Sequence, residues 1–191
     1  MDAAATTERT ARIDAIRQAA IPVFAAQGYR GTSMADLAAA AGVSRPALYQ
    51  YFANRADLFR AAFDTLLQAS TDTALAALGE QADLADRLDG FLQRLSGDAY
   101  EQLATMPHGD ELMEAKHEFA ADVAADALAR AHHGLRAFLV ADAGDHPSIG
   151  AAIDLLTLSP LGLKSDHPSP AEYRQRLTAL ADAAAALLGE R

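Results

Sequence analysis

The chain has 191 residues, a formal net charge of −10 and no cysteine. Disulfides, thiolate metal ligands and thiol redox chemistry are therefore excluded, and the length suffices for one or two domains with a real hydrophobic core. No apolar run reaches the roughly 18 residues that a membrane-spanning helix needs, and the N-terminus lacks the pattern of a secretory signal. We therefore expect a cytoplasmic protein with no membrane partner.

Charge is distributed unevenly along the chain. Residues 1–60 carry seven arginines against five acidic residues, whereas residues 61–191 carry nine basic against 21 acidic residues. Alanine supplies much of the 51% hydrophobic content, and runs of β-branched residues are scarce. The composition predicts an all-α protein with a mildly basic N-terminal part and an acidic C-terminal part.

A first helix is predicted over residues 8–27. Its apolar residues recur at helical spacing, and Gly28 is suited to end it. Pro22 lies inside this stretch and predicts a kink, because proline removes a backbone hydrogen bond from a helix interior.

Two short helices with a glycine turn between them are predicted next. Ser33, followed three residues later by Asp36, forms a capping-box pattern, and Gly42 is suited to end that helix. Ser44 can cap the second helix, where Pro46 fits because the first backbone donors of a helix have no intrahelical partner. Helix, short glycine turn, helix is the helix-turn-helix pattern.

The second short helix separates apolar from polar side chains. Leu48 and Phe52 lie four residues apart and share a face toward a small core, which leaves Arg45, Tyr49 and Gln50 on other faces. Arginine and glutamine can read base edges, and tyrosine hydroxyls can bind phosphates. This helix is therefore suited to the major groove of DNA.

The rest of the chain predicts five longer helices. Asn54 is suited to cap the first of them, which continues to about residue 78. Ser148 and Ser169 are the expected caps of the last two. Gly97 and Gly134 are possible interruptions. The four later helices are expected over residues 84–104, 110–142, 148–163 and 170–188.

Three strings carry a family resemblance. They are Gly-Tyr-Arg-Gly-Thr-Ser-Met-Ala-Asp-Leu-Ala at residues 28–38, Ala-Gly-Val-Ser-Arg-Pro-Ala-Leu-Tyr-Gln-Tyr-Phe at 41–52 and Asn-Arg-Ala-Asp-Leu at 54–58. Together they resemble the DNA-binding domain of TetR-family transcriptional regulators, over roughly residues 10–60. The resemblance implies a helix-turn-helix DNA-binding domain at residues 1–53 and a helical-bundle effector-binding and dimerisation domain at residues 54–191.

The resemblance also implies a function. It is that of a homodimeric, ligand-responsive repressor, not an enzyme and without a cofactor, which binds an inverted-repeat operator in double-stranded DNA and is released by a small hydrophobic effector. Carried over onto matching positions, the DNA-contacting candidates are Thr32, Ser33, Ser44, Arg45, Pro46, Ala47, Tyr49, Gln50, Tyr51 and Arg55. Of these, Arg45, Ala47 and Gln50 are the base-facing candidates.

Effector binding is expected in the middle helices, where apolar residues accompany a few polar groups. The candidates are Leu66, Phe91, Leu95, Tyr100, Leu103, Met106, His108, Met113, His117 and Phe119. Pairing of subunits is expected on the last two helices. Its candidates are Ile149, Ile153, Leu156, Leu177, Leu180, Ala181, Ala184 and Leu188. For both sets, ordinary core packing is the competing interpretation.

Two other functions compete with DNA binding. Glu114 and His117 have the Glu-x-x-His spacing of a metal-binding helical bundle, but a di-iron site needs a second such pair, so neither a metal site nor a catalytic residue is expected. A helical module that binds a protein partner is the other alternative. Such a module would not need Arg45 and Tyr49 on the short helix.

Overall fold

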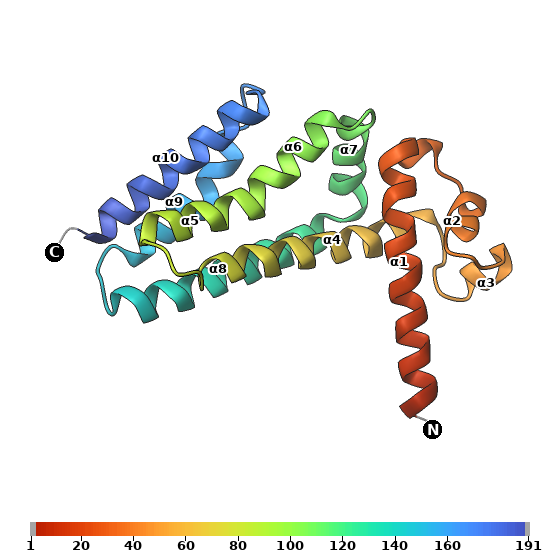
Figure 1. Ribbon diagram of the computed structural model, residues 1–191. Helices are drawn as coiled ribbons and strands as arrows, with labels where there is room; N and C mark the ends of the chain where they lie inside the picture. Colours follow the sequence, from red (N-terminus) through yellow and green to blue (C-terminus); the bar gives the residue numbers. More distant parts are fainter. Residues whose placement is uncertain (1–2, 190–191) are drawn as a thin grey trace. The chain divides into compact units, whose positions relative to one another are not determined.

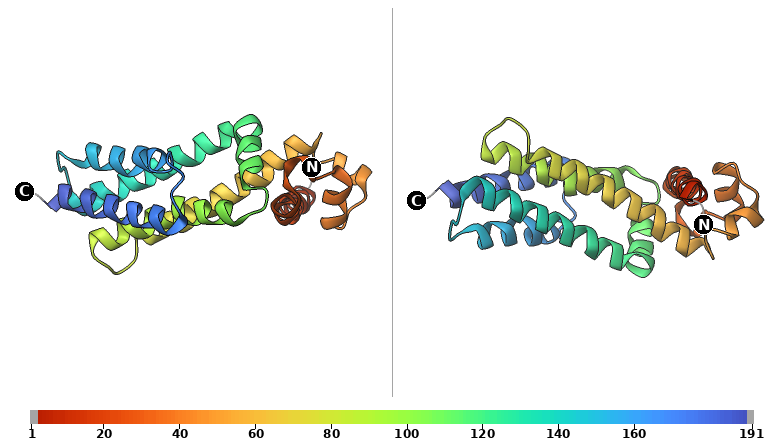
Figure 2. Two further views of the ribbon diagram at one scale, coloured as in Figure 1. Left: turned by 90° about the horizontal axis from the view of Figure 1, so that it is seen from above. Right: turned by 90° about the horizontal axis from the view of Figure 1, so that it is seen from below.

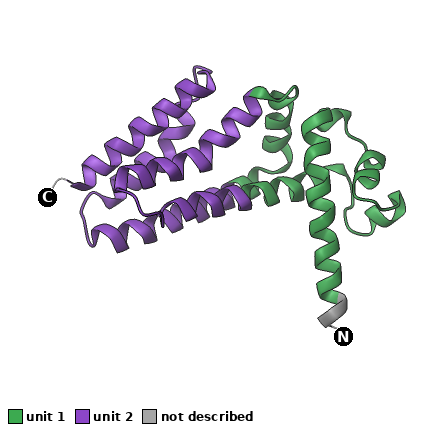
Figure 3. Cartoon of the chain, in the orientation of Figure 1, with its two compact units in different colours: residues 1–67, 105–124 green, residues 68–104, 125–191 purple. Residues whose placement is uncertain are grey.

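The computed structural model describes residues 3–189, and these contain helices and no strand. The all-α prediction is therefore confirmed. The helices form two compact units, which are coloured separately in Figure 3. Unit 1 is built from Met1–Leu67 and Thr105–Ala124, and unit 2 from Gln68–Ala104 and Ala125–Arg191. The functional boundary between residues 53 and 54 stays a prediction.

Unit 1 contains a three-helix head, the first half of the long helix that follows it, and a later segment of the chain (Figure 1). Its helices are α1 (Ala3–Gly31), α2 (Met34–Ala40), α3 (Arg45–Tyr49), the first half of α4 (Arg55–Ala77), α7 (Gly109–Phe119) and the start of α8 (Ala121–Ala143). Figure 2 looks along α1 and shows α2 and α3 together on one side of it. The head buries Ile16, Phe24, Leu37, Leu48 and Phe52.

The first helix is longer than predicted. α1 begins at Ala3, and its backbone angles are helical at Pro22. Within the described residues of α1, the backbone angles are non-helical at Gly28, where φ is 70°. The backbone stays helical at Pro22, and a bend of the helix axis there stays a prediction. The break at Gly28 uses the left-handed conformation, which glycine adopts without a steric penalty.

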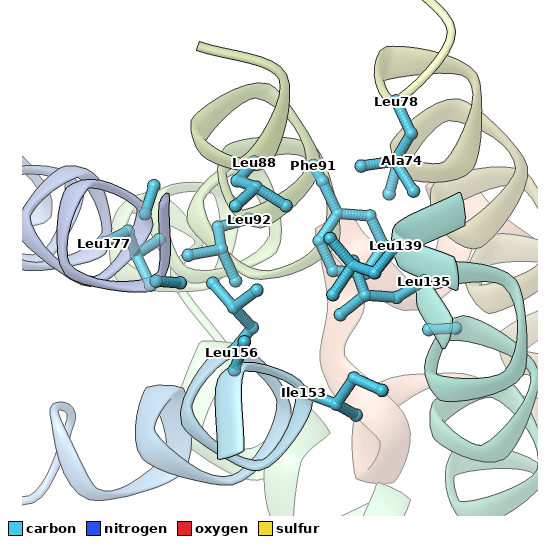
Figure 4. Packing of buried hydrophobic residues seen from close by; sticks show 14 of the residues in the cluster. Ala74, Leu78, Leu88, Phe91, Leu92, Leu135, Leu139, Ile153, Leu156 and Leu177 are labelled. Atoms are coloured by element: carbon cyan, nitrogen blue, oxygen red, sulfur yellow. The ribbon is translucent and has the colours of Figure 1, made fainter. Parts of the chain in front are cut away.

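Unit 2 contains the remaining helices and their shared core. They are α5 (Leu84–Leu92), the π-helix η1 (Gln93–Gly97), α6 (Asp98–Thr105), α9 (Ile149–Gly162) and α10 (Pro170–Gly189), with the second half of α4 and most of α8. α10 packs against α5 and α9. Figure 4 shows Leu88, Phe91 and Leu92 of α5 turned toward the apolar side chains of α8, α9 and α10.

This core contains the residues that were predicted to pair the subunits. Ile149, Ile153, Leu156, Leu177, Ala181, Ala184 and Leu188 belong to the buried cluster, and Leu180 packs against it. The apolar stripes of α9 and α10 face each other and α5, so they stabilise the single subunit. This burial favours the competing interpretation of ordinary core packing, and a role for these residues in pairing stays a prediction.

Two predicted helices are divided. The helix expected over residues 84–104 passes through the π-helical turn that ends at Gly97. The helix expected over residues 110–142 breaks at Ala120, where φ is −139° and ψ is 21°. Gly134 does not interrupt α8; a Cβ at this position would lie 3.0 Å from Cδ1 of Leu75, so the glycine lets α8 approach α4 closely within unit 2.

The predicted caps mostly form. The Oγ of Ser169 accepts from the backbone N–H of Glu172 at 3.3 Å, and the Oδ1 of Asn54 accepts from that of Asp57 at 2.9 Å. Ser148 stands at the predicted cap position of α9, but its side chain makes no capping hydrogen bond.

Candidate nucleic-acid interface

The start of α2 is fixed by a complete capping box. The Oγ of Ser33 accepts from the backbone N–H of Asp36 at 3.2 Å, while the carboxylate of Asp36 accepts from the backbone N–H of Ser33 at 2.9 Å. The Ser33 hydroxyl and backbone N–H both stabilise the charged carboxylate, and they lower the pKa of Asp36 below its ordinary value of 3.8.

A tight turn then sets the direction of α3. Gly42 has φ +63°, and its neighbour Val43 donates its backbone N–H to the carbonyl of Ala38 at 3.0 Å. No atom lies within 4 Å of where a Cβ of Gly42 would stand. The glycine is therefore required by the backbone conformation and not by crowding.

α3 is held at one end by a cap and on one face by two apolar side chains. The Oγ of Ser44 accepts from the backbone N–H of Ala47 at 3.2 Å. Leu48 is 0% exposed, and Phe52, which follows the helix, is also buried. These contacts fix the orientation of a helix that is too short to be stable alone.

The other faces of α3 are open to solvent. Arg45, Pro46, Tyr49 and Gln50 are exposed and Ala47 is partly exposed; the exposed fraction of Tyr49 is 44%. The Nη2 of Arg45 lies 3.5 Å from the hydroxyl of Tyr49, and the guanidinium carbon lies 5.7 Å from the centre of the Tyr49 ring. The guanidinium of Arg45 and the hydroxyl of Tyr49 therefore lie side by side on the exposed surface of α3.

Two other predicted DNA contacts are used within the head. Thr32 is buried, and its hydroxyl donates to the carbonyl of Gly28 at 2.6 Å. Arg55 donates to the carbonyls of Thr32 at 2.8 Å and Arg30 at 3.2 Å, and its guanidinium lies 4.1 Å from the centre of the Tyr29 ring. These side chains hold the end of α1, and a role for Thr32 and Arg55 in DNA binding stays a prediction.

The effector candidates fall into both compact units. Leu66, Met106, His108, Met113, His117 and Phe119 belong to unit 1, and Phe91, Leu95, Tyr100 and Leu103 to unit 2. Phe91 is fully buried in the core of unit 2, and the hydroxyl of Tyr100 donates to the carbonyl of Pro168 at 2.7 Å. An effector role for these ten residues stays a prediction.

Residues 3–189 contain no cluster of side chains with the geometry of a metal site. No group of three or more His, Asp or Glu residues in this range could hold a metal ion. Glu114 instead accepts from Arg30 at 3.0 Å, and the Nδ1 of His117 lies 2.7 Å from the carbonyl of Met113. The Glu-x-x-His spacing therefore reflects an exposed helix face.

One contact between distant parts of the chain has no signal in the sequence. α7 packs on the end of α1 within unit 1: the Glu111 carboxylate accepts from the backbone N–H of Arg30, and the rings of Tyr29 and Phe119 stack with their centres 4.9 Å apart. The hydrogen bond joins residues 81 positions apart. Local pattern reasoning has no means of finding such a pair.

The arrangement of α2 and α3, with an exposed polar α3, defines a helix-turn-helix head of the kind that binds DNA. Residues 16–62 match the family model described as "Bacterial regulatory proteins, tetR family". Over 111 residues the chain is 34% identical to the HTH-type transcriptional regulator TtgR of Pseudomonas putida, and this stretch covers 56% of this chain and 51% of TtgR. These matches show that residues 16–62 form a DNA-binding domain of the TetR type.

Solved structures whose titles name them TetR-family regulators share the fold of this chain. The TetR family repressor AlkX from a Dietzia species is 18% identical, with a TM-score of 0.63, over 92% of this chain and 97% of AlkX. A tetR-family transcriptional regulator from Streptomyces coelicolor is 22% identical, with a TM-score of 0.56, over 93% of this chain and 83% of that protein. At these identities the likeness establishes the fold alone.

The match to the curated relatives is partial. The chain spans about half the length of TtgR. Within the described residues, no helix combines the length and apolar character needed to cross a membrane.

Proposed function

We propose that the chain is a ligand-responsive repressor that binds an inverted-repeat operator as a homodimer in the cytoplasm. The observation that carries this proposal is that α3 has one buried apolar face and an exposed polar face. Leu48 is fully buried and orients the helix, whereas Arg45 and Gln50 are exposed and have no role in the core. Such side chains suit bidentate hydrogen bonds to guanine and adenine in the major groove.

The remaining head contacts would position the protein on the DNA. Ser33 and Ser44 are the N-cap residues of α2 and α3, Tyr49 is exposed on α3, and the partly exposed Tyr51 follows α3. Hydroxyls and helix N-termini are common phosphate ligands. Pro46 and Ala47 supply apolar contact to a thymine methyl.

A second copy of the chain is the proposed pairing partner. Leu158 and Leu161 of α9 are 60% and 64% exposed, the highest values among the large exposed hydrophobic residues of the described chain. We place them at the centre of the proposed dimer surface, beside the more buried residues of α9 and α10. A dimer would present two α3 helices about 34–36 Å apart, which is one turn of DNA, and would therefore favour a two-fold symmetric site.

The proposed effector is a small hydrophobic molecule, and its action is a change in the spacing of the two heads. α7 supports this, because it carries Met113, His117 and Phe119 from the effector candidates and also contacts the end of α1. An effector that binds better to a conformation in which α7 has moved would shift the population toward heads that no longer fit adjacent grooves.

The proposal is tested by selecting bound sites from random duplex DNA with the full chain. We expect an inverted repeat whose recovery falls steeply as salt is raised, because phosphate contacts release counterions. Recovery of a single half-site would contradict the dimer. Recovery of no enriched motif would contradict DNA recognition by this chain.

A further inference from the structure

The N-terminal turns of α1 extend past the helices that it packs against, as Figure 1 shows for the end marked N. Residues 6–12 are exposed, whereas Ile16, Ala20 and Phe24 are buried in the head. The first turns thus contribute no apolar burial to the head core.

Two arginines on these turns continue the buried stripe of α1. Arg9 precedes Ile16 by seven residues and Arg12 precedes it by four, so both lie on the same face of α1 as the buried Ile16. At 1.5 Å per residue, Arg9 stands about 10 Å beyond Ile16 along the helix axis. The buried apolar face of α1 is therefore followed, toward the N-terminus, by the positive charges of Arg9 and Arg12.

Arg9 reaches the segment that follows α3. Its guanidinium carbon lies 5.1 Å from the centre of the Tyr51 ring. Within the described part of the chain no carboxylate is within ion-pair distance of Arg9, while the acidic Asp14 lies near Arg17 at 3.7 Å. An exposed cation–π contact is worth only about 0.5–1 kcal/mol and leaves the guanidinium N–H donors free for a partner.

We propose that Arg9 binds a backbone phosphate of the DNA, with the Tyr51 ring holding its guanidinium in place. The proposal rests on the function proposed above, and it adds α1 to the DNA-contacting surface. A planar guanidinium matches a phosphate through two parallel hydrogen bonds. Because phosphates are alike in every sequence, the contact adds affinity and positions α3 without adding base preference.

The test measures equilibrium binding of the full chain to its selected operator over a range of salt concentrations. Arg9→Ala is compared with the parent chain and with Arg136→Ala, which removes the same charge from an exposed position of α8 in unit 2. Arg9→Ala should reduce the slope of log K against log salt by about 0.9 per subunit bound, or about 1.8 for a dimer. Arg136→Ala should leave the slope unchanged, and far-UV circular dichroism should show all three chains equally folded.

A double-mutant cycle separates the contribution of the Tyr51 ring from that of the Tyr51 hydroxyl. Tyr51→Phe keeps the ring, so Arg9→Ala should have its full effect in that background; Tyr51→Ala removes the ring, so the effect should shrink. Selected sites should show the same motif for Arg9→Ala and the parent chain. An operator-binding parent whose slope and affinity are unaffected by Arg9→Ala overturns this inference and leaves the proposed function standing, whereas a parent that selects no motif overturns both.

Discussion

At the scale of single residues, the side chains of α3 that pack into the core differ from those proposed to contact DNA. Leu48 is 0% exposed and Tyr49, its neighbour, is 44% exposed. Ser44 satisfies a backbone donor in the first turn of the helix, and Arg45 and Gln50 are exposed to solvent without a part in the core. Substitutions of the exposed residues should therefore change binding and leave folding intact.

Arg45→Ala and Gln50→Ala should each relax the base preference at one position of each half-site. A good bidentate pair supplies about 1–3 kcal/mol of discrimination, so each variant should lose roughly 5- to 150-fold preference there. Competition against operators with single base changes measures this loss. Gln175→Ala, at an exposed position of α10, is the matched control. Equal weakening on every operator would assign the side chain to a phosphate.

Gly42→Ala should destabilise the head by about 1–2 kcal/mol, because a non-glycine residue is strained at φ +63°. Urea unfolding followed by circular dichroism measures the change. Gly150→Ala is the control, since Gly150 lies within α9, has no positive φ and has no atom within 4 Å of the added Cβ. Equal stability of both variants would show that the turn relaxes without strain.

At the scale of elements, capping boxes are well predicted from local sequence, and helix partners are not. Ser33 with Asp36 and Ser169 with Glu172 form the expected caps, since each pair needs only three residues of separation. The break at Ala120 and the contact of Glu111 with Arg30 depend on tertiary packing. An apolar stripe such as that of α10 predicts burial, but it carries no information on whether the covering surface belongs to the same chain.

The capping box of α2 makes part of the head's stability depend on pH. The Ser33 hydroxyl and backbone N–H hold the folded-state pKa of Asp36 below its ordinary value of 3.8. The contribution is therefore fully present above that value and is lost as the pH falls toward the lowered pKa. The measurement compares the unfolding free energy at pH 7 with that at pH 3. Asp36→Asn should lose this pH-dependent part of the stability, whereas Asp182→Asn, at an exposed position of α10, should keep it. Identical pH profiles would refute the assignment.

At the scale of the whole molecule, the charge and the exposed leucines are distributed unevenly. Residues 1–60 have seven basic and five acidic residues, whereas residues 61–191 have nine and 21. The all-α fold class and the helix-turn-helix head followed from the sequence, because the diagnostic residues of the head are close together in the chain. Leu158 and Leu161 did not stand out among the apolar residues of α9, because their exposure depends on how α9, α10 and α5 pack.

Leu158→Glu combined with Leu161→Glu should shift the chain from dimer to monomer, since charges would replace apolar contact at the proposed dimer surface. The dimer dissociation constant should rise at least about tenfold, which corresponds to roughly 1.4 kcal/mol. Sedimentation measures it. Leu128→Glu, at a 37% exposed position of α8, is the control. Unchanged dimerisation in the double variant would place the interface elsewhere.

The separation of Leu48 and Ser44 from Arg45, Ala47 and Gln50 has a practical consequence. The first pair keeps α3 in place, and the other three side chains are not needed for that purpose. A library that randomises only these three positions should retain correctly assembled heads in most of its members. Screening it against altered target sequences should yield variants that bind new DNA sites and still respond to the proposed effector.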